Sequence, residues 1–117
     1  MGTSSDEKIV LEIKTLFFGG IDFLVKKGGI LSMKSFRGVH IYLTNKNLEI
    51  YSRILLVKEL KIFEVLLPDI LYFRKDEKLW RRIRLGYREN NEEKEILLIL
   101  KKKDINILIR ELNKLIS

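Results

Sequence analysis

Residues 38–51 read Gly-Val-His-Ile-Tyr-Leu-Thr-Asn-Lys-Asn-Leu-Glu-Ile-Tyr, and this stretch determines the fold class of the 117-residue chain. Aliphatic residues alternate with polar or aromatic ones on both sides of Asn45–Asn47, which is the period of a strand with one buried face. Asparagine and lysine at 45–47 are typical of a turn, so the stretch predicts an antiparallel β-hairpin. The aliphatic positions are Val39, Ile41, Leu43, Leu48 and Ile50.

Similar alternation continues on both sides of this hairpin. Residues 9–17 fit a strand, with aliphatic residues at 9, 11 and 13, or a helix, with apolar residues at 9, 13 and 17. The glycine pair at 19–20 breaks or bulges the chain, the pair at 28–29 suits a tight turn, and residues 89–93 form a polar turn. Pro68 cannot donate a ladder hydrogen bond and marks an edge or a bend. We expect about seven antiparallel strands, drawn from residues 9–13, 21–25, 30–36, 39–43, 48–50, 62–67, 70–73, 79–88 and 95–100.

The hydrophobic period changes to that of a helix near the end of the sequence. Asp104 suits the N-cap position, and Arg110 and Lys114 fall opposite the apolar stripe. One amphipathic helix is therefore expected to pack on an open end or face of the sheet. Ile107 lies off the stripe and is expected near solvent. The stripe consists of Ile105, Leu108, Ile109, Leu112, Leu115 and Ile116.

Composition limits the class of protein. Apolar residues make up 46% of the chain and charged residues 33%, which is the balance of a globular protein. The absence of cysteine excludes disulfides, thiolate metal sites and cysteine nucleophiles. No stretch approaches the roughly 20 apolar residues that span a bilayer, and the opening MGTSSDE lacks the apolar core of a signal peptide. We expect a disordered leader over residues 1–7, one domain over 8–117 and a cytoplasmic location.

The formal net charge of +7 comes from two local segments. Residues 74–88 hold seven basic side chains against Asp76 and Glu77, and residues 26–37 hold four with no acid. Such segments suit anionic partners, which include phospholipid headgroups, nucleic acids and acidic proteins. The alternative is that lysine and arginine solvate strand edges and oppose aggregation.

The sequence contains few residues that suit catalysis. His40 is the single histidine, and the alternation puts it on a sheet surface, where an imidazole pairs with neighbours far more often than it acts as a base. One histidine and scattered carboxylates make neither a Ser-His-Asp grouping nor a metal site. The glycine pairs do not precede helices as phosphate-binding loops do. We expect no enzyme activity, no cofactor and no metal.

The strongest functional signal is the segment 74–84. Read as a strand, it places Trp80, Arg82 and Arg84 on one face and the apolar Ile83 on the other. An indole beside guanidinium groups can insert at a membrane interface while the arginines bind phosphate, or it can stack on nucleic-acid bases. The alternative is that Trp80 folds back beneath the arginine stems.

Several stretches make the chain similar to the pleckstrin-homology (PH) superfold, in its GRAM and GLUE branches. Residues 38–51 resemble those branches, because one strand ends in threonine and the next begins with leucine after a short turn. Residues 63–73 resemble the strand pair that follows. Residues 11–16 and 107–112 resemble the first strand and the closing helix of the GLUE domain in the ESCRT-II complex. The resemblance covers about residues 8–116 and implies a barrel of about seven antiparallel strands capped by a C-terminal helix.

This resemblance also implies a function. It points to a non-catalytic binding module of a membrane-sorting adaptor, cytoplasmic and peripherally membrane-associated, beside other ESCRT-type subunits. Its partners would be an anionic membrane surface, ubiquitin or a ubiquitin-like protein, or both, with ubiquitin binding at Ile107 and Arg110. The rivals are a basic nucleic-acid-binding β-domain and a structural docking domain of a larger assembly. The lipid-binding residues would be Lys75, Lys78, Trp80, Arg81, Arg82 and Arg84.

Overall fold

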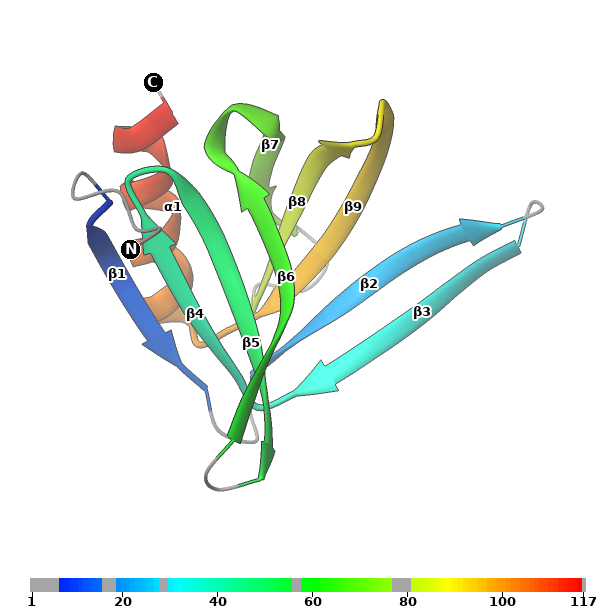
Figure 1. Cartoon of the computed structure of the whole chain (residues 1–117), viewed down its shortest axis with the longest axis horizontal. Coiled ribbons are helices and arrows are strands. Elements are labelled where there is room, and N and C mark those ends of the chain that lie inside the picture. Colours follow the sequence, from blue (N-terminus) through cyan, green and yellow to red (C-terminus); the bar gives the residue numbers. More distant parts are fainter. Residues whose placement is uncertain (1–6, 16–18, 28–29, 56–57, 77–80, 117) are drawn as a thin grey trace.

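The structure is a computed structural model, and it describes residues 7–15, 19–27, 30–55, 58–76 and 81–116. In these residues nine strands form two antiparallel sheets, and one helix follows them (Figure 1). The expectation of a mainly β fold with a C-terminal helix is therefore confirmed. No helix in the described ranges combines the length and the hydrophobicity that crossing a bilayer requires.

The two sheets have the strand orders β1-β4-β5-β6 and β3-β2-β9-β8-β7. In Figure 1 the hairpin of β2 and β3 projects to the right, while α1 stands beside β1 on the left. The first sheet contains β1 (Ile9–Lys14), β4 (Val39–Thr44), β5 (Asn47–Leu55) and β6 (Lys58–Leu66). The second contains β2 (Gly20–Lys27), β3 (Ile30–Arg37), β7 (Ile70–Lys75), β8 (Arg82–Glu89) and β9 (Glu92–Ile99). A short 3-10 turn, η1 (Leu67–Asp69), joins the sheets, and α1 spans Lys102–Ile116.

Nine strands are observed where about seven were expected, because two long arms cross from one sheet to the other. Gly38 alone separates β3 from β4, and its φ of 70° is one that glycine adopts at little cost. β1 pairs with β4 and β2 pairs with β3, so both arms of one hairpin bend together. Thr15 holds this bend, since its Oγ1 accepts the N–H of Val39 at 2.8 Å. Counted as one strand each, the two bent arms bring the total to seven.

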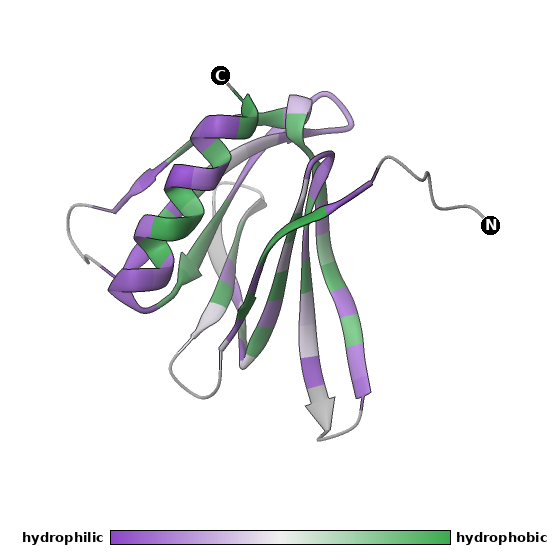
Figure 2. Cartoon of the chain, turned by 90° about the vertical axis from the view of Figure 1, so that its left-hand side faces the viewer, coloured by the Kyte–Doolittle hydropathy of each residue, from purple (hydrophilic) through white to green (hydrophobic). Residues whose placement is uncertain are grey.

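The hydrophobic core lies between the sheets and beneath α1. Ile41 and Leu43 of β4 are fully buried, as the alternation predicts. Ile105, Leu108 and Leu112 of α1 are also fully buried, and Figure 2 shows apolar and polar bands alternating along this helix. Because α1 contacts β1, β7 and η1, it closes the space between the edge strands β1 and β7.

Some elements begin earlier than expected, among them α1 and β6. α1 begins at Lys102 rather than after an N-cap at Asp104. The N–H of Ile105 donates to the carbonyl of Lys101 at 2.9 Å, so the lysines form the first turn. Asp104 lies within that turn, where the helix dipole favours a carboxylate. β6 begins at Lys58 rather than at residue 62. The sequence did not predict this earlier start, because the first residues of β6 are mostly polar and carry no hydrophobic alternation.

The hairpin of β8 and β9 turns more tightly than the expected polar turn over residues 89–93. The strands stay paired as far as Glu89 and Glu92, which leaves a two-residue turn. Asn90 and Asn91 have φ values of 52° and 65° there. Asparagine tolerates this left-handed region, which a tight hairpin turn with the right twist requires.

The ambiguous first segment is a strand over residues 9–14. Ile9 is 63% exposed while Ile13 is 4% exposed, because an irregularity after Ile9 shifts the pairing with β4. Ile9 therefore does not share the buried face that the alternation indicated. Several expectations lie outside the described residues, namely residues 1–6 of the leader, the glycine turn at 28–29, Lys78 and Trp80.

Candidate functional site

Basic side chains gather where β7 ends and where β8 and α1 begin. The N–H of Asp76 donates to the carbonyl of Arg82 at 3.0 Å, which holds the end of β7 against the start of β8. The N–H of Leu100 donates to the carbonyl of Arg81 at 2.9 Å, so the lysine run that follows Leu100 lies beside Arg81. We call the resulting group the basic surface. It consists of Arg37, Lys75, Arg81, Arg82, Lys101, Lys102 and Lys103.

Arg37 joins the basic surface through a row of paired residues across the second sheet. Arg82 is paired with Ile99. Gly20 is paired with Ile99 on one side and with Arg37 on the other. Directly paired residues point to the same face, so Arg82 and Arg37 lie on one face of the sheet, three strand spacings or about 15 Å apart between their Cα atoms. Arg82 is half-buried, and the other six basic-surface residues are exposed.

Arg84 lies next to this surface but is already neutralised. Its Nη1 lies 2.5 Å from Glu95 Oε1, and its Nη2 lies 3.5 Å from Asp76 Oδ2. Those two acids are therefore occupied by Arg84. Within the described residues no basic-surface side chain forms an ion pair. The described side chains therefore do not cancel the positive charge of this surface.

The sequence-predicted lipid residues are thus divided by the structure. Lys75, Arg81 and Arg82 come together on the basic surface, whereas Arg84 is held in its ion pairs. Arg37 and the run 101–103 were not predicted. The run is plain in the sequence as three consecutive lysines, but strand pairing is needed to bring it to Arg81.

The two residues expected to bind ubiquitin lie on α1. Ile107 is half-buried rather than open to solvent, and Arg110 has a 65% exposed side chain. Arg110 Nε lies 3.4 Å from Glu111 Oε2. Residues three apart on a helix are neighbours, so Ile107 and Arg110 do share one surface.

His40 is buried rather than placed on an open sheet surface, with 4% of the residue exposed. Its Nε2 lies 2.6 Å from Glu12 Oε2 on β1, and its Nδ1 lies 2.7 Å from Glu59 Oε2 on β6. The Tyr42 ring stacks on the imidazole with centroids 4.2 Å apart. The alternation placed His40 on the correct face of β4, but side chains from two other strands cover that face.

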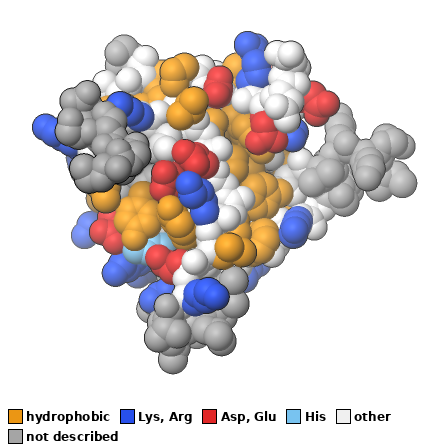
Figure 3. Space-filling model, viewed as in Figure 1, with side chains coloured by type: hydrophobic (Ala, Val, Ile, Leu, Met, Phe, Trp, Pro, Cys, Tyr) orange, Lys and Arg blue, Asp and Glu red, His pale blue; other side chains and the backbone are white. Residues whose placement is uncertain are grey.

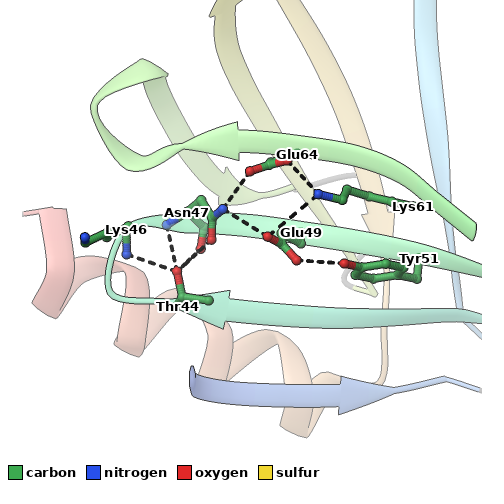
Figure 4. A network of polar contacts seen from close by, with 7 residues as sticks. All are labelled: Thr44, Lys46, Asn47, Glu49, Tyr51, Lys61 and Glu64. Carbon is green, nitrogen blue, oxygen red and sulfur yellow. Dashed lines mark hydrogen bonds and ion pairs between the residues drawn. The ribbon is translucent and has the colours of Figure 1, made fainter. Parts of the chain in front are cut away.

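A second polar network continues across the same sheet (Figure 4). The side-chain amide of Asn47 donates to Glu64 at 2.7 Å and to Glu49 at 3.1 Å. Lys61 Nζ donates to Glu64 at 2.8 Å, and this bond lowers the pKa of the Glu64 carboxyl. Burial, and then the hydrogen bond to Glu49, raises the pKa of Tyr51. These contacts tie β5 to β6.

The chemistry of these networks is cross-strand stabilisation. Both imidazole nitrogens of His40 contact carboxylate oxygens, so neither points into an open cavity. Burial, followed by the charges of Glu59 and Glu12, raises the pKa of Tyr42, so its phenol stays protonated at neutral pH. In the described part of the chain, no three histidine, cysteine, aspartate or glutamate side chains are grouped to hold a metal ion.

Comparisons with known proteins identify the fold. No family model and no curated protein matches the sequence. The solved DH/PH domains of PDZ-RhoGEF, in complex with GTP-gamma-S-activated RhoA, match with a TM-score of 0.67 and 15% identity, over 94% of this chain and 29% of that chain. The solved DH/PH domains of p115-RhoGEF match with a TM-score of 0.63 and 12% identity, over 93% of this chain and 30% of that chain.

These likenesses show the fold alone, because the sequence identities are low. The chain spans less than a third of the length of each neighbour. It has a PH-like fold, as the sequence predicted, with two antiparallel sheets and one closing helix. The assignment to the GRAM and GLUE branches and the closeness to ESCRT-II stay predictions.

Proposed function

We propose that this PH-like domain is a non-catalytic binding module that docks peripherally on anionic phospholipid headgroups through the basic surface. The observation that carries this proposal is the convergence of seven cations from β3, β7, the start of β8 and the start of α1. Six of them are exposed, and they lie at the end of the second sheet where β7 ends and β8 and α1 begin. Each lysine or arginine close to an anionic leaflet contributes about 1 kcal/mol of attraction.

The neighbouring residues favour a membrane over a nucleic acid. Non-specific nucleic-acid binding combines cations with exposed aromatic rings on which bases stack. The described tyrosine on β7, Tyr72, lies under a guanidinium, with Arg74 Cζ 4.8 Å from its ring centroid.

The test is co-sedimentation with phosphatidylcholine vesicles with and without phosphatidylserine. Arg81→Gln with Lys102→Gln removes two exposed cations of the basic surface. The matched control is Arg88→Gln with Lys114→Gln, which lowers the charge equally near the far ends of β8 and α1. Arg88 lies about 23 Å from Arg81 in the direction of β8, and Lys114 lies about 18 Å from Lys102 along α1. The first pair should weaken binding by about 30-fold, and the control pair by much less.

Two results would contradict the proposal. One is equal binding of the wild type to vesicles with and without phosphatidylserine. The other is equal loss in both variant pairs, which would show a response to net charge rather than to the basic surface. A short oligonucleotide that displaced the protein from vesicles, and that bound the wild type more tightly than the vesicles did, would favour the nucleic-acid alternative.

A second candidate is a ubiquitin-binding role in a sorting adaptor of the ESCRT-II type. Its support is the exposed guanidinium of Arg110 beside the half-buried Ile107 on α1. Titration of labelled ubiquitin with the domain should then shift ubiquitin amide resonances, and Arg110→Glu should remove those shifts. Absence of shifts with the wild type would eliminate this candidate and leave the membrane proposal intact.

A further inference from the structure

A groove follows the open edge of β6. In the described residues β6 pairs with β5 alone. The N–H of Leu67 donates to the carbonyl of Lys46 at 3.0 Å. This bond shows which residues of β6 direct their main-chain N–H and C=O groups towards β5. In an antiparallel ladder, successive residues point their main-chain groups to opposite sides. The N–H and C=O of Glu64 and the N–H of Leu66 therefore face away from β5, towards the groove, while the C=O of Leu66 serves as the N-cap carbonyl of η1.

Two adjoining hollows make up this groove, with volumes of about 1050 and 550 Å³. Both are lined by Glu64 of β6 and by Tyr87 and Glu89 of β8, so they continue into one another. Part of the lining is aromatic: Phe23 is half-buried, and the nearly buried Phe63 lies between Phe23 and Tyr87, with ring centroids 6.0 and 5.0 Å away. Figure 3 shows hydrophobic side chains between acidic ones on this face.

The groove is acidic although the chain as a whole is basic. Its lining contains six carboxylates and four cations. Three of the four cations already contact a carboxylate of the groove, in the pairs Lys61–Glu64, Arg84–Glu95 and Lys94–Glu89. The carboxylates of Glu92 and Glu93 are exposed at the rim and form no ion pair within the described ranges.

We propose that this groove binds an extended cationic peptide segment of a partner protein, which adds a strand to the edge of β6. The N–H and C=O of Glu64 and the N–H of Leu66 supply hydrogen bonds to the added strand, as in other cases of strand addition. Alternate apolar side chains of the segment face the aromatic lining. Its lysines or arginines pair with Glu92 and Glu93, which selects against acidic segments.

This site differs from the basic surface. The rim of the groove at Glu89, at the end of β8, lies about 23 Å along the strand from Arg82 of the basic surface, although the groove also extends to Arg84, two residues from Arg82. The two surfaces also carry opposite charge, so they suit different ligands. The peptide proposal therefore does not depend on membrane docking.

The first test uses a short fluorescein-labelled peptide of alternating lysine and valine, measured by fluorescence anisotropy. The wild-type protein should bind it, and a matched peptide of alternating glutamate and valine should not bind. The variant Glu92→Gln with Glu93→Gln should bind the lysine peptide about fivefold to tenfold more weakly than the wild type does. Arg81→Gln with Lys102→Gln, the variant of the basic surface, should leave this affinity unchanged.

The second test removes one main-chain donor from the edge. Leu66→Pro deletes the outward N–H without breaking a bond to β5, and the φ of −74° at this position suits proline. This variant should bind the peptide at least about tenfold more weakly, while Leu66→Ala should bind nearly as the wild type. In the wild type, hydrogen exchange of the Glu64 amide should slow when the peptide is added.

Several outcomes would overturn the proposal. Equal binding of the lysine and glutamate peptides would remove the charge argument. Unchanged binding by Leu66→Pro, in a protein whose spectrum shows that it is folded, would remove the edge pairing. A concentration-dependent dimer of the wild type that Leu66→Pro abolishes would show that a second copy of this chain, rather than a peptide, occupies the edge.

Discussion

Gly86→Ala tests how Tyr72 is placed on the second sheet. Gly86 of β8 is paired with Tyr72 on one side and with Glu95 on the other. The Tyr72 ring crosses over the glycine, and its hydroxyl donates to Glu95. A Cβ added at Gly86 would overlap this ring, so alanine can fit only if the ring moves away.

The cost of that movement can be worked from the contacts that would be lost. The hydrogen bond from Tyr72 to Glu95 is partly exposed and contributes about 1 kcal/mol. The cation–π contact with Arg74 contributes roughly 0.5–1 kcal/mol. Replacing glycine by alanine within a strand raises the free energy of unfolding by about 0.5–1 kcal/mol. Gly86→Ala should therefore destabilise the protein by about 1 kcal/mol.

A double-mutant cycle isolates this contact. In a Tyr72→Ala background the ring is absent, so Gly86→Ala should stabilise the protein by about 0.5–1 kcal/mol. The free energy of unfolding of all four proteins is measured by urea denaturation. If Gly86→Ala had the same effect in both backgrounds, the ring would not rest on the glycine and the reasoning would be wrong.

Three further substitutions test the fold and its polar contacts. Thr15→Val keeps the side-chain shape but leaves the N–H of Val39 without its acceptor. The free energy of unfolding, measured by urea denaturation, should fall by about 1–3 kcal/mol. An unchanged midpoint would contradict the role of Thr15 at the bend. Leu108→Ala opens a cavity beneath α1 and should cost about 2–5 kcal/mol, whereas the exposed Leu60→Ala should cost little. Lys61 lowers the pKa of Glu64, so their contact stabilises the fold at neutral pH and is lost as the pH falls through the folded-state pKa. Lys61→Met should make the free energy of unfolding depend less on pH in this range. It should lower that free energy by less than about 1 kcal/mol at neutral pH, because both side chains are partly exposed. A pH dependence as steep as that of the wild type would argue against the contact.

The hydrophobic pattern predicted most of the elements because strand and helix periods are local properties. Ile41 and Leu43 of the quoted hairpin are buried as their alternation indicates, and so are Ile105 and Leu108 of the helix. Element ends were predicted less well. At Lys58 and Lys102 the residues are polar, so the pattern gives no signal, and main-chain hydrogen bonds decide where the element begins.

The candidate site could be predicted only in part. Arg81 and Arg82 are adjacent in sequence, so their position together at one strand end is a local property. Their union with Arg37 and with the lysines at 101–103 depends on pairing across β8, β9, β2 and β3. Arg84 was assigned to the same set, but Glu95 comes from the neighbouring strand and neutralises it.

The sequence by itself determined that this chain alternates through a PH-like series of strands, ends in an amphipathic helix and carries an excess of positive charge near residues 74–88. The tertiary structure alone decided which charges stay available, because a charge is cancelled or left free by the side chains that strand pairing brings beside it. It also buried His40 between Glu12 and Glu59, and it left the edge of β6 open along an acidic groove. These features arise from contacts between residues far apart in the chain, which no local period encodes.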